Sequence, residues 1–290
     1  MKTFIIQCDK NKLPTTDLGY QLIKAIEFNH WYHINDSMPD YDYILSESIT
    51  PGHMIFYPVG SVKFMQSWFD LYNIKVKPIN VPPSLDVFAK RDIIRTKDED
   101  FRKACEWYGF NGYYIVKDDS KIKGFCERVN FPDLREDGIN YTEMFNLTHA
   151  FISEYVEDIQ SEWRCFVFNG ELLDCRHYLG DFKITPSYPM IEQLIEEIPY
   201  GAYTVDVGVS MTRGTILIEM HQFFSYGLYG FFDPNNLPLM LIDTLDRILK
   251  NKKEQEDSEM RNFTPEEKSG YRKYINTFFK STGKKIYDLD

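Results

Sequence analysis

The sequence lacks the features of a membrane-spanning protein and of one that binds nucleic acids non-specifically. No apolar run approaches the roughly 20 residues needed to cross a bilayer, and segment 1–7 is too short for the apolar part of a signal peptide. Basic residues are in the minority: 33 Lys and Arg stand against 44 Asp and Glu, a net charge of −11 that repels a phosphate backbone. We therefore expect no membrane association, no non-specific nucleic-acid binding and a cytoplasmic location, which for a viral protein is the host cytoplasm.

Cysteines and common catalytic motifs are also scarce. The five cysteines are odd in number and show no CxxC spacing, which argues against a disulfide framework and a zinc site. The chain has no Walker A motif, no GxGxxG after an expected strand and no nucleophile elbow. Packing surface is plentiful, with 43% apolar and 16% aromatic residues in 290. This length and composition predict one large or two modest globular domains.

The beginning of the chain has the pattern of a small α/β unit. Prolines 82 and 83 then interrupt it, because proline fixes its own φ and disfavours helix in the residue before it. We place a domain boundary there, after residue 82. The elements expected before it are strands at 3–7 and 43–45 and helices at 17–28 and 62–72.

The rest of the chain predicts several strands, a hairpin and further helices. Asn169 and Gly170 are the preferred pair of a type I′ turn, in which both residues adopt positive φ. The run of charges at 250–258 is expected to be solvated and mobile. The other expected elements are strands at 92–95, 113–117, 151–156, 163–168 and 171–178, and helices at 96–109, 239–249 and 264–280, the first begun by a capping box of Thr96 and Glu99.

A second hairpin is expected from two alternating segments, 203–209 and 215–220. With a four-residue loop at 211–214, Asp206 lies directly across from Glu219. Alternation on the second strand places Ile216, Ile218 and Met220 on the core face, and Leu217, Glu219 and His221 on the other.

Two lysines form the first candidate binding cluster. Lys117 closes an apolar strand and Lys123 precedes Gly124, so a short loop can bring both ammonium groups back together. Such a pair can grip a polyphosphate. A solvated hairpin tip rich in charge gives the same pattern.

An arginine on a strand forms the second cluster. Period-2 alternation places Glu162 and Arg164 on one face and Trp163 on the other. Arg164 could meet a terminal phosphate with two parallel hydrogen bonds. A sheet with one solvent-facing side shows the same alternation.

Asp206, Glu219 and His221 form the third cluster. Two carboxylates facing each other across a hairpin repel, and each raises the pKa of the other unless a cation lies between them. Mg²⁺ would remove that cost, since it prefers oxygen ligands together with substrate phosphates. The alternative is the polar outer face of an edge hairpin.

In chain order, these clusters resemble the ATP-grasp superfamily, and most closely its R2K clade of bacterial or bacteriophage type. The resemblance covers about residues 88–235 and is carried by segments 114–117, 123–125, 152–156, 161–167, 205–209, 218–221 and 225–230. It implies an α+β protein, with an ATP-grasp fold of two α+β subdomains preceded by a small α/β N-terminal domain. The implied domains are 1–82, the ATP-grasp domain at 83–250, and a charged segment with a C-terminal helix at 251–290.

The resemblance also implies roles for individual residues. Glu154, Tyr155 and Val156 would form the hinge strand that meets the adenine edge. Arg164, at the γ-phosphate, and Lys123 would be the catalytic residues. The implied nucleotide contacts are Lys117, Lys123, Glu154, Tyr155, Val156, Glu162 and Arg164. The implied metal ligands are Asp206, Glu219 and His221, where His221 replaces the usual Asn and shifts the metal preference from Mg²⁺ toward Mn²⁺.

The activity that the resemblance implies is ATP-dependent carboxylate–amine ligation through an acyl phosphate, with release of ADP. The partners would be a small-molecule or peptide carboxylate and an amine. Two alternatives remain open: an ATP-grasp phosphotransferase, and a nucleotide-binding interaction protein without turnover. Three basic residues outside these motifs, Lys90, Arg91 and Arg95, could bind an anionic substrate or solvate a strand, and we favour solvation for two of them.

Overall fold

The computed structural model describes residues 2–33, 41–97, 112–120, 122–130, 149–224 and 226–261. The chain divides into two compact units, Met1–Leu245 and Asp246–Asp290, and each is described by itself. All strands among the described residues belong to the first unit. Among the described helices, none is long and apolar enough to span a membrane. The mixture of helices with parallel and antiparallel sheets confirms the α+β class.

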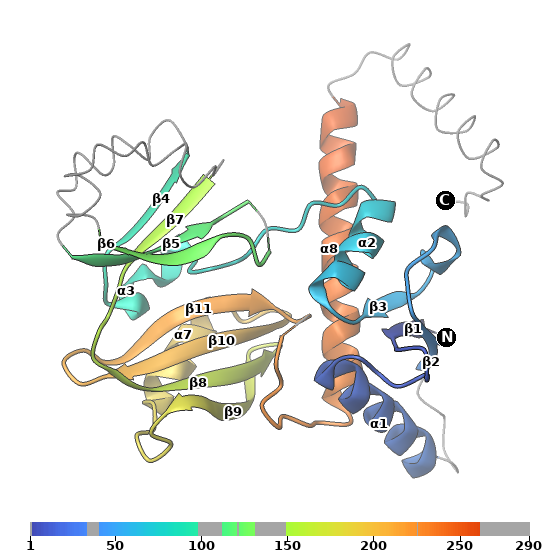
Figure 1. Ribbon diagram of the computed structural model, residues 1–290, viewed down its shortest axis with the longest axis horizontal. Coiled ribbons are helices and arrows are strands. Elements are labelled where there is room, and N and C mark those ends of the chain that lie inside the picture. Colours follow the sequence, from blue (N-terminus) through green and yellow to red (C-terminus); the bar gives the residue numbers. More distant parts are fainter. Residues whose placement is uncertain are drawn as a thin grey trace. The chain divides into compact units, whose positions relative to one another are not determined.

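A small parallel sheet begins the first unit, with the strand order β2-β1-β3 (Figure 1). Its longest helix starts at the N-cap Thr16, whose hydroxyl accepts from the Gly19 N–H at 3.1 Å. The bounds are β1 (Lys2–Gln7), α1 (Asp17–Tyr32), β2 (Tyr41–Ser46), a 3₁₀ turn (Pro51–His53), β3 (Tyr57–Val59) and α2 (Val62–Leu71). All four elements expected here are confirmed, with ends that differ by a few residues.

An antiparallel sheet of short strands follows, in the order β4-β7-β5-β6. Its strands are β4 (Ile93–Lys97), β5 (Tyr113–Asp118), β6 (Cys126–Asn130) and β7 (His149–Glu154), preceded by a 3₁₀ turn (Pro83–Leu85) and α3 (Asp86–Ala89). We call it the lysine sheet, because Lys117 closes β5. Thr96, the expected cap of a helix, lies in β4, and residues 98–111 lie outside the described ones.

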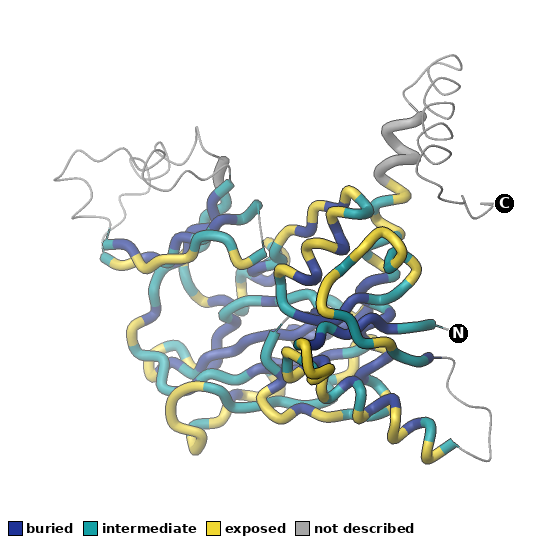
Figure 2. Tube along the Cα trace, turned by 45° about the vertical axis from the view of Figure 1, so that its right-hand side comes forward, coloured by how far each residue is buried: buried dark blue, intermediate teal, exposed yellow. Residues whose placement is uncertain are grey.

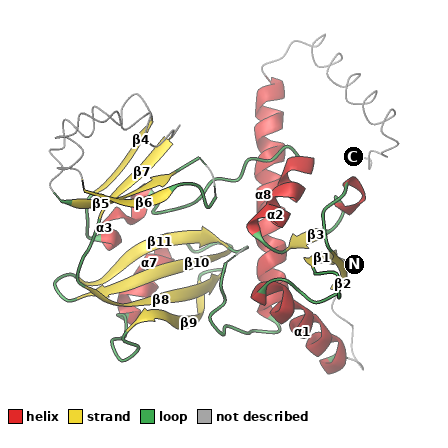
Figure 3. Ribbon diagram, in the orientation of Figure 1, coloured by secondary structure: helices red, strands yellow, loops and turns green. Residues whose placement is uncertain are grey.

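A second antiparallel sheet has longer strands, in the order β11-β10-β8-β9. Its elements are β8 (Ile159–Phe168), β9 (Glu171–Gly180), α7 (Tyr188–Glu197), β10 (Ala202–Ser210) and β11 (Gly214–Gln222). We call it the carboxylate sheet, after Asp206 and Glu219. The expected turn is confirmed, with φ of 49° at Asn169 and 80° at Gly170. Figure 3 shows both four-stranded sheets in yellow, with α3 and α7 beside them.

A β-bulge in β11 corrects one expectation. Ser210 pairs with Gly214, so the loop has three residues instead of four, and the register then shifts by one between Asp206 and Val207. The shift restores the expected pairing of Asp206 with Glu219. Between the loop and the bulge, residues of β11 therefore lie on the face of the sheet opposite to the one expected. Leu217, expected opposite the core, is fully buried in the core beside Val207.

Two apolar clusters hold the first unit together, and exposed residues concentrate in turns and on outer helix faces (Figure 2). One cluster joins the parallel sheet and α1 to Phe166 and to the start of α8, through buried side chains such as Leu22 and Met240. The other packs Leu194 of α7 against the inner face of the carboxylate sheet. The carboxylate sheet is therefore covered on both faces, which fixes the positions of its strands.

Helix α8 (Asn236–Arg261) crosses into the second unit. The expected end of this helix at residue 249 is wrong, since the helix continues through the charged run that follows. Lys and Glu are good helix formers, and Lys250 pairs with Glu254 one turn on, at 3.7 Å. The expected helix at 264–280 lies outside the described residues. The domain limits at 82 and 250 stay predictions.

Candidate active site

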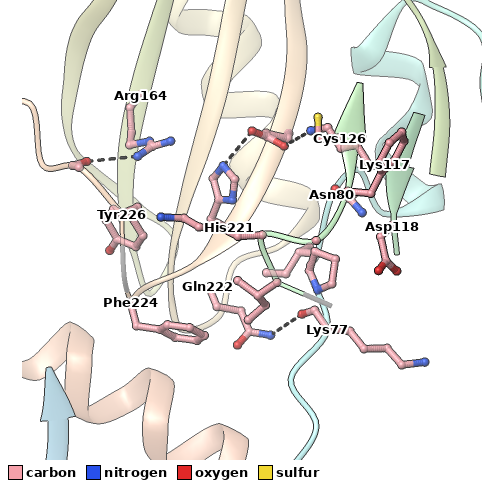
Figure 4. Close-up of a pocket in the computed structure, with 18 of the residues that line it drawn as sticks. Lys77, Asn80, Lys117, Asp118, Cys126, Arg164, His221, Gln222, Phe224 and Tyr226 are labelled. Atoms are coloured by element: carbon pink, nitrogen blue, oxygen red, sulfur yellow. Dashed lines mark hydrogen bonds and ion pairs between the residues drawn. The ribbon is translucent and has the colours of Figure 1, made fainter. Parts of the chain in front are cut away.

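A cavity of about 370 Å³ is lined by both four-stranded sheets and by the linker segment 77–80 (Figure 4). From the lysine sheet it receives Lys117 and Lys123, and from the carboxylate sheet Arg164, Glu219 and His221. In the view of Figure 4, His221 lies between Arg164 and Lys117. Residues that are far apart in sequence thus bring cationic and acidic groups to one cavity.

Arg164 and Asp206 form a buried ion pair at one end of the cavity. They are cross-strand partners on β8 and β10, and the guanidinium donates from Nε at 2.7 Å and from Nη2 at 2.6 Å. Only 8% of the arginine side chain and 3% of the aspartate side chain are exposed. Nη1 also donates to the Gly227 carbonyl at 3.2 Å. A buried pair is tolerated when its hydrogen bonds are satisfied, as they are here.

Three tyrosine rings surround the Arg164 guanidinium. Tyr178, Tyr226 and Tyr229 lie with their ring centres 5.8, 5.3 and 5.2 Å from its central carbon. Tyr178 also stacks on Tyr229 and donates its hydroxyl to Glu162 at 2.6 Å. Cation–π contacts of this kind favour arginine over lysine at the site. Together with its hydrogen bonds, the three rings restrict the orientation of the guanidinium.

His221 lies between the two carboxylates of this sheet. Its Nε2 is 3.4 Å from Asp206 Oδ2 and 3.2 Å from Glu219 Oε1. Burial lowers the pKa of His221, but the two carboxylates outweigh it and raise the pKa to about 9. The imidazole is therefore protonated at neutral pH and offsets the repulsion between Asp206 and Glu219.

Glu219 connects the two sheets, since its other oxygen accepts from the Lys117 ammonium. Burial raises the pKa of Glu219, but His221 and Lys117 more than offset it and hold the pKa well below its usual range. The carboxylate is therefore ionised and paired with cations on both oxygens.

Lys123 lies in the turn between β5 and β6 and has a positive φ of 51°. The next residue, Gly124, lies against Asp118: a Cβ on Gly124 would be 2.8 Å from the Asp118 Cβ, too close for any side chain. Lys123 is exposed and has no ion pair within the part of the chain that the structure describes. Its ammonium is therefore not occupied by a described carboxylate. Among the described residues that line the cavity, Lys77 is likewise exposed and without an ion pair.

The other residues that the resemblance implied lie away from these groups. Among the described residues that line the cavity, Glu154, Tyr155, Val156 and Glu162 are absent. The Glu154 carboxylate accepts two hydrogen bonds from Arg213, one of them at 2.9 Å. These four assignments stay predictions, as do those of the residues at the cavity.

Sequence reasoning missed the role of Arg91, two of whose partners lie more than 120 residues away. Its guanidinium donates to the Ile218 carbonyl at 2.7 Å and to the Leu217 carbonyl. These two carbonyls belong to the bulge that precedes Glu219, so Arg91 supports the bulge and is not a solvating residue. Lys90 and Arg95 also have protein partners, the Arg213 carbonyl and Asp86. No local pattern could have revealed them.

The donor set of the carboxylate sheet fits a divalent cation. One ligand atom each from Asp206, Glu219 and His221 lie within 4.8 Å of one another. The two carboxylates supply the oxygen ligands that Mg²⁺ prefers, and the imidazole nitrogen also suits Mn²⁺. A metal at this position would have to replace the imidazole proton and the Lys117 ammonium, which would free Lys117 for another anion.

Comparison with protein families gives one match: the model described as ATP-grasp domain, R2K clade family 2, matches residues 88–238. A search of curated proteins gives no match.

The chain is also similar to several solved structures. D-alanyl-alanine synthetase A from Vibrio cholerae has 13% sequence identity and a TM-score of 0.47, and the match covers 85% of this chain and 99% of that chain. N5-carboxyaminoimidazole synthetase from Staphylococcus aureus has 12% identity and a TM-score of 0.48, with 83% of this chain and 76% of that chain covered. D-alanine–D-alanine ligase from Bacillus anthracis has 13% identity and a TM-score of 0.48, with 87% of this chain and 99% of that chain covered.

Proposed function

The chain belongs to family 2 of the R2K clade of ATP-grasp domains, and from this premise we propose that it is an ATP-dependent ligase joining a carboxylate to an amine. One observation carries the proposal: Lys117, Lys123 and Arg164 reach the same cavity from two sheets, next to two carboxylates that could hold a metal. Three cations around one cavity suit a triphosphate better than a neutral ligand. The substrates would be a small-molecule or peptide carboxylate and an amine.

The proposed reaction has two steps. A carboxylate oxygen of the substrate attacks the γ-phosphorus of ATP, an acyl phosphate forms, and the bond to the bridging oxygen breaks to release ADP. The amine nitrogen then attacks the acyl carbon, phosphate leaves and the amine loses a proton. Positioning and charge neutralisation carry most of the catalysis in such transfers. Lys123 and Arg164 would stabilise the charge on the transferred group, and Lys117 would hold the remaining phosphates.

Asp206, Glu219 and His221 would hold the divalent cation. The cation supplies charge neutralisation to the phosphates when it is bound. In the structure, His221 and Lys117 offset the negative charge of the two carboxylates. On this account, these two side chains would exchange partners when Mg²⁺ and ATP bind.

The same ion pairs also favour a second candidate, a nucleotide-binding protein without turnover. Arg164 is held by Asp206 with two hydrogen bonds, and His221 stands where the family usually has Asn. If these contacts persist with ATP bound, the γ-phosphate lacks its arginine and the metal lacks a ligand. Binding would then occur without transfer.

Trapping with hydroxylamine separates these possibilities. The protein is incubated with Mg²⁺, ATP, hydroxylamine and a panel of amino acids and peptides, and ADP and hydroxamate are measured. A ligase gives ADP and hydroxamate in equal amounts with its proper carboxylate. ADP with a phosphorylated acceptor and no hydroxamate indicates a phosphotransferase. Nucleotide binding without ADP from any carboxylate of the panel contradicts the ligase proposal.

Lys123→Met tests the proposed catalytic role of this lysine in the same assay. Because Lys123 is exposed and unpaired among the described residues, its loss should leave the fold intact. We expect ADP release to fall by about 100-fold, the usual cost of removing one charge-stabilising donor. Unchanged release would remove Lys123 from the proposed mechanism.

His221→Asn tests the metal assignment. An amide oxygen is a better ligand for Mg²⁺ than an imidazole nitrogen, so the variant should preserve or improve the use of Mg²⁺ relative to Mn²⁺. The measurement is the metal dependence of ATP binding. Complete loss of binding with both metals would assign the imidazole a different role.

A further inference from the structure

The linker segment 77–80 runs along the outer edge of β11. The Met220 N–H donates to the Asn80 carbonyl at 2.7 Å, and the two residues form an antiparallel bridge. The Gln222 side chain adds a longer contact, 3.4 Å, to the Lys77 carbonyl. Met220 lies between Glu219 and His221 in the sequence, so this backbone contact lies beside the candidate metal ligands.

The side chain of Asn80 makes a second contact, to the other sheet. Its Nδ2 donates to Asp119 Oδ1 at 2.7 Å. Asp119 begins the turn that follows β5, and its own N–H donates to the His149 carbonyl at 3.0 Å. Asn80 is only 4% exposed and lines the cavity (Figure 4). One residue therefore joins β11 to the turn that carries Lys123.

The backbone of Asn80 restricts which residue can do this. Its φ is 52°, in the left-handed region that Gly and Asn tolerate best. Glycine could adopt this conformation, but it has no side chain to donate to Asp119. Aspartate could adopt it, but its carboxylate would face that of Asp119. Asparagine meets both requirements at once.

We propose that Asn80 is a positioning residue of the nucleotide site, which holds the β5–β6 turn at a fixed distance from β11 through its contacts with Asp119 and Met220. We call these two contacts the Asn80 clasp. The inference rests on the proposed function, since it assumes that the cavity binds ATP. Lys123 is held by the turn and Glu219 by β11. The clasp therefore sets the distance between these two residues, across which the phosphates and the metal would bind. Without it, ATP would have to order the turn on binding and would bind less tightly.

Three variants test the clasp at the Asn80–Asp119 bond. Asn80→Gly keeps the backbone conformation and removes the donor, and we expect the Kd of Mg²⁺-ATP to rise about fivefold to tenfold. Asn80→Asp should cost more, because two carboxylates then face each other. The exchange Asn80→Asp with Asp119→Asn keeps the net charge and restores one donor and one acceptor, so it should recover most of the affinity that Asn80→Asp loses.

Asn73→Asp is the matched control. Asn73 also has a positive φ of 52°, is exposed and does not line the cavity. This variant adds the same charge seven residues earlier in the chain, away from the cavity, and should leave the Kd unchanged. The Kd is measured by titration calorimetry at 25 °C, well below the melting temperature of each variant, so that lower stability alone does not alter it.

The outcomes are distinct. A wild-type Kd for Asn80→Gly, or an exchange variant as weak as Asn80→Asp, overturns the clasp while leaving the proposed function in place. A wild-type protein that does not bind Mg²⁺-ATP overturns the proposed function, and the clasp falls with it. Weakened binding in Asn80→Gly and Asn80→Asp, recovered in the exchange variant, supports both.

Discussion

Two arginine–carboxylate pairs of this protein have the same chemistry and different surroundings. Arg164 and Asp206 pair within the carboxylate sheet, with 8% and 3% of their side chains exposed. Arg213 and Glu154 pair between the β10–β11 loop and the lysine sheet, with 30% and 28% exposed. Both arginines donate two hydrogen bonds to their carboxylate. Burial is therefore the main difference between them.

The comparison indicates where the site is rigid and where it can adjust. Removing one partner of a buried pair leaves an uncompensated charge in the core, whereas an exposed pair exchanges with water at little cost. If the proposed function is correct, the carboxylate sheet would be the rigid part of the site, which holds the metal and the γ-phosphate. The contact at Glu154 can open without loss of the fold, which would let the lysine sheet adapt to a bound nucleotide.

The largest expected effect is on the buried pair. Asp206→Ala should lower the free energy of unfolding by about 3–5 kcal/mol, because Arg164 is left charged and unpaired in the core. Denaturant unfolding at pH 7 measures it. The double variant Arg164→Met with Asp206→Leu should be more stable than Asp206→Ala, since it removes both charges. A loss below about 1 kcal/mol for Asp206→Ala would show that the pair is no more rigid than a surface one.

An intermediate effect is expected at the bulge. Arg91→Met removes both donors from the Leu217 and Ile218 carbonyls, and leaving such acceptors unpaired costs about 1–3 kcal/mol. Because the bulge turns Glu219 toward Asp206, the variant should also weaken Mg²⁺-dependent ATP binding. Unfolding and nucleotide titration are measured on the same samples. A lower free energy of unfolding with unchanged ATP binding would show that Arg91 stabilises the fold without positioning the site.

The smallest effect is expected at the half-buried pair of Arg213 and Glu154. Glu154→Gln should lower stability by about 0–1 kcal/mol at pH 7. Arg213 holds the pKa of Glu154 below its usual value, so the contribution is present above about pH 4.3 and disappears as the pH falls through the lowered pKa. Comparing unfolding of the variant and the wild type between pH 7 and pH 3 measures this. A difference that grows toward low pH would contradict the assignment.

Local features of the sequence predicted local structure well. The Asn169–Gly170 turn follows from the φ angles that its two residues tolerate, and α1 begins at residue 17, as expected. The pairing of Asp206 with Glu219 was also predicted, although through a loop of the wrong length. The bulge that corrects the register accepts hydrogen bonds from Arg91, and the alternation of residues along β11 does not predict it.

Contacts between distant segments could not be predicted in this way. The motif that predicts Glu154 at the adenine gives no sign of its hydrogen bond with Arg213, which lies 59 residues away. Asn80 lies next to the expected domain boundary, but the neighbouring residues predict neither its positive φ nor its hydrogen bond to Asp119. The motifs therefore identified the groups at the cavity but not the residues that hold them there.

Thermal unfolding with and without Mg²⁺-ATP, on the wild type and Glu219→Ala, tests the central claim most directly. The claim is that the cavity between the lysine and carboxylate sheets binds a metal–nucleotide complex. ATP at about 100 times its Kd should stabilise the wild type by roughly 2.7 kcal/mol, a clear rise in melting temperature. Glu192→Ala on the exposed face of α7 should show the same rise and Glu219→Ala none. No rise in the wild type, or an equal rise in Glu219→Ala, would contradict the account.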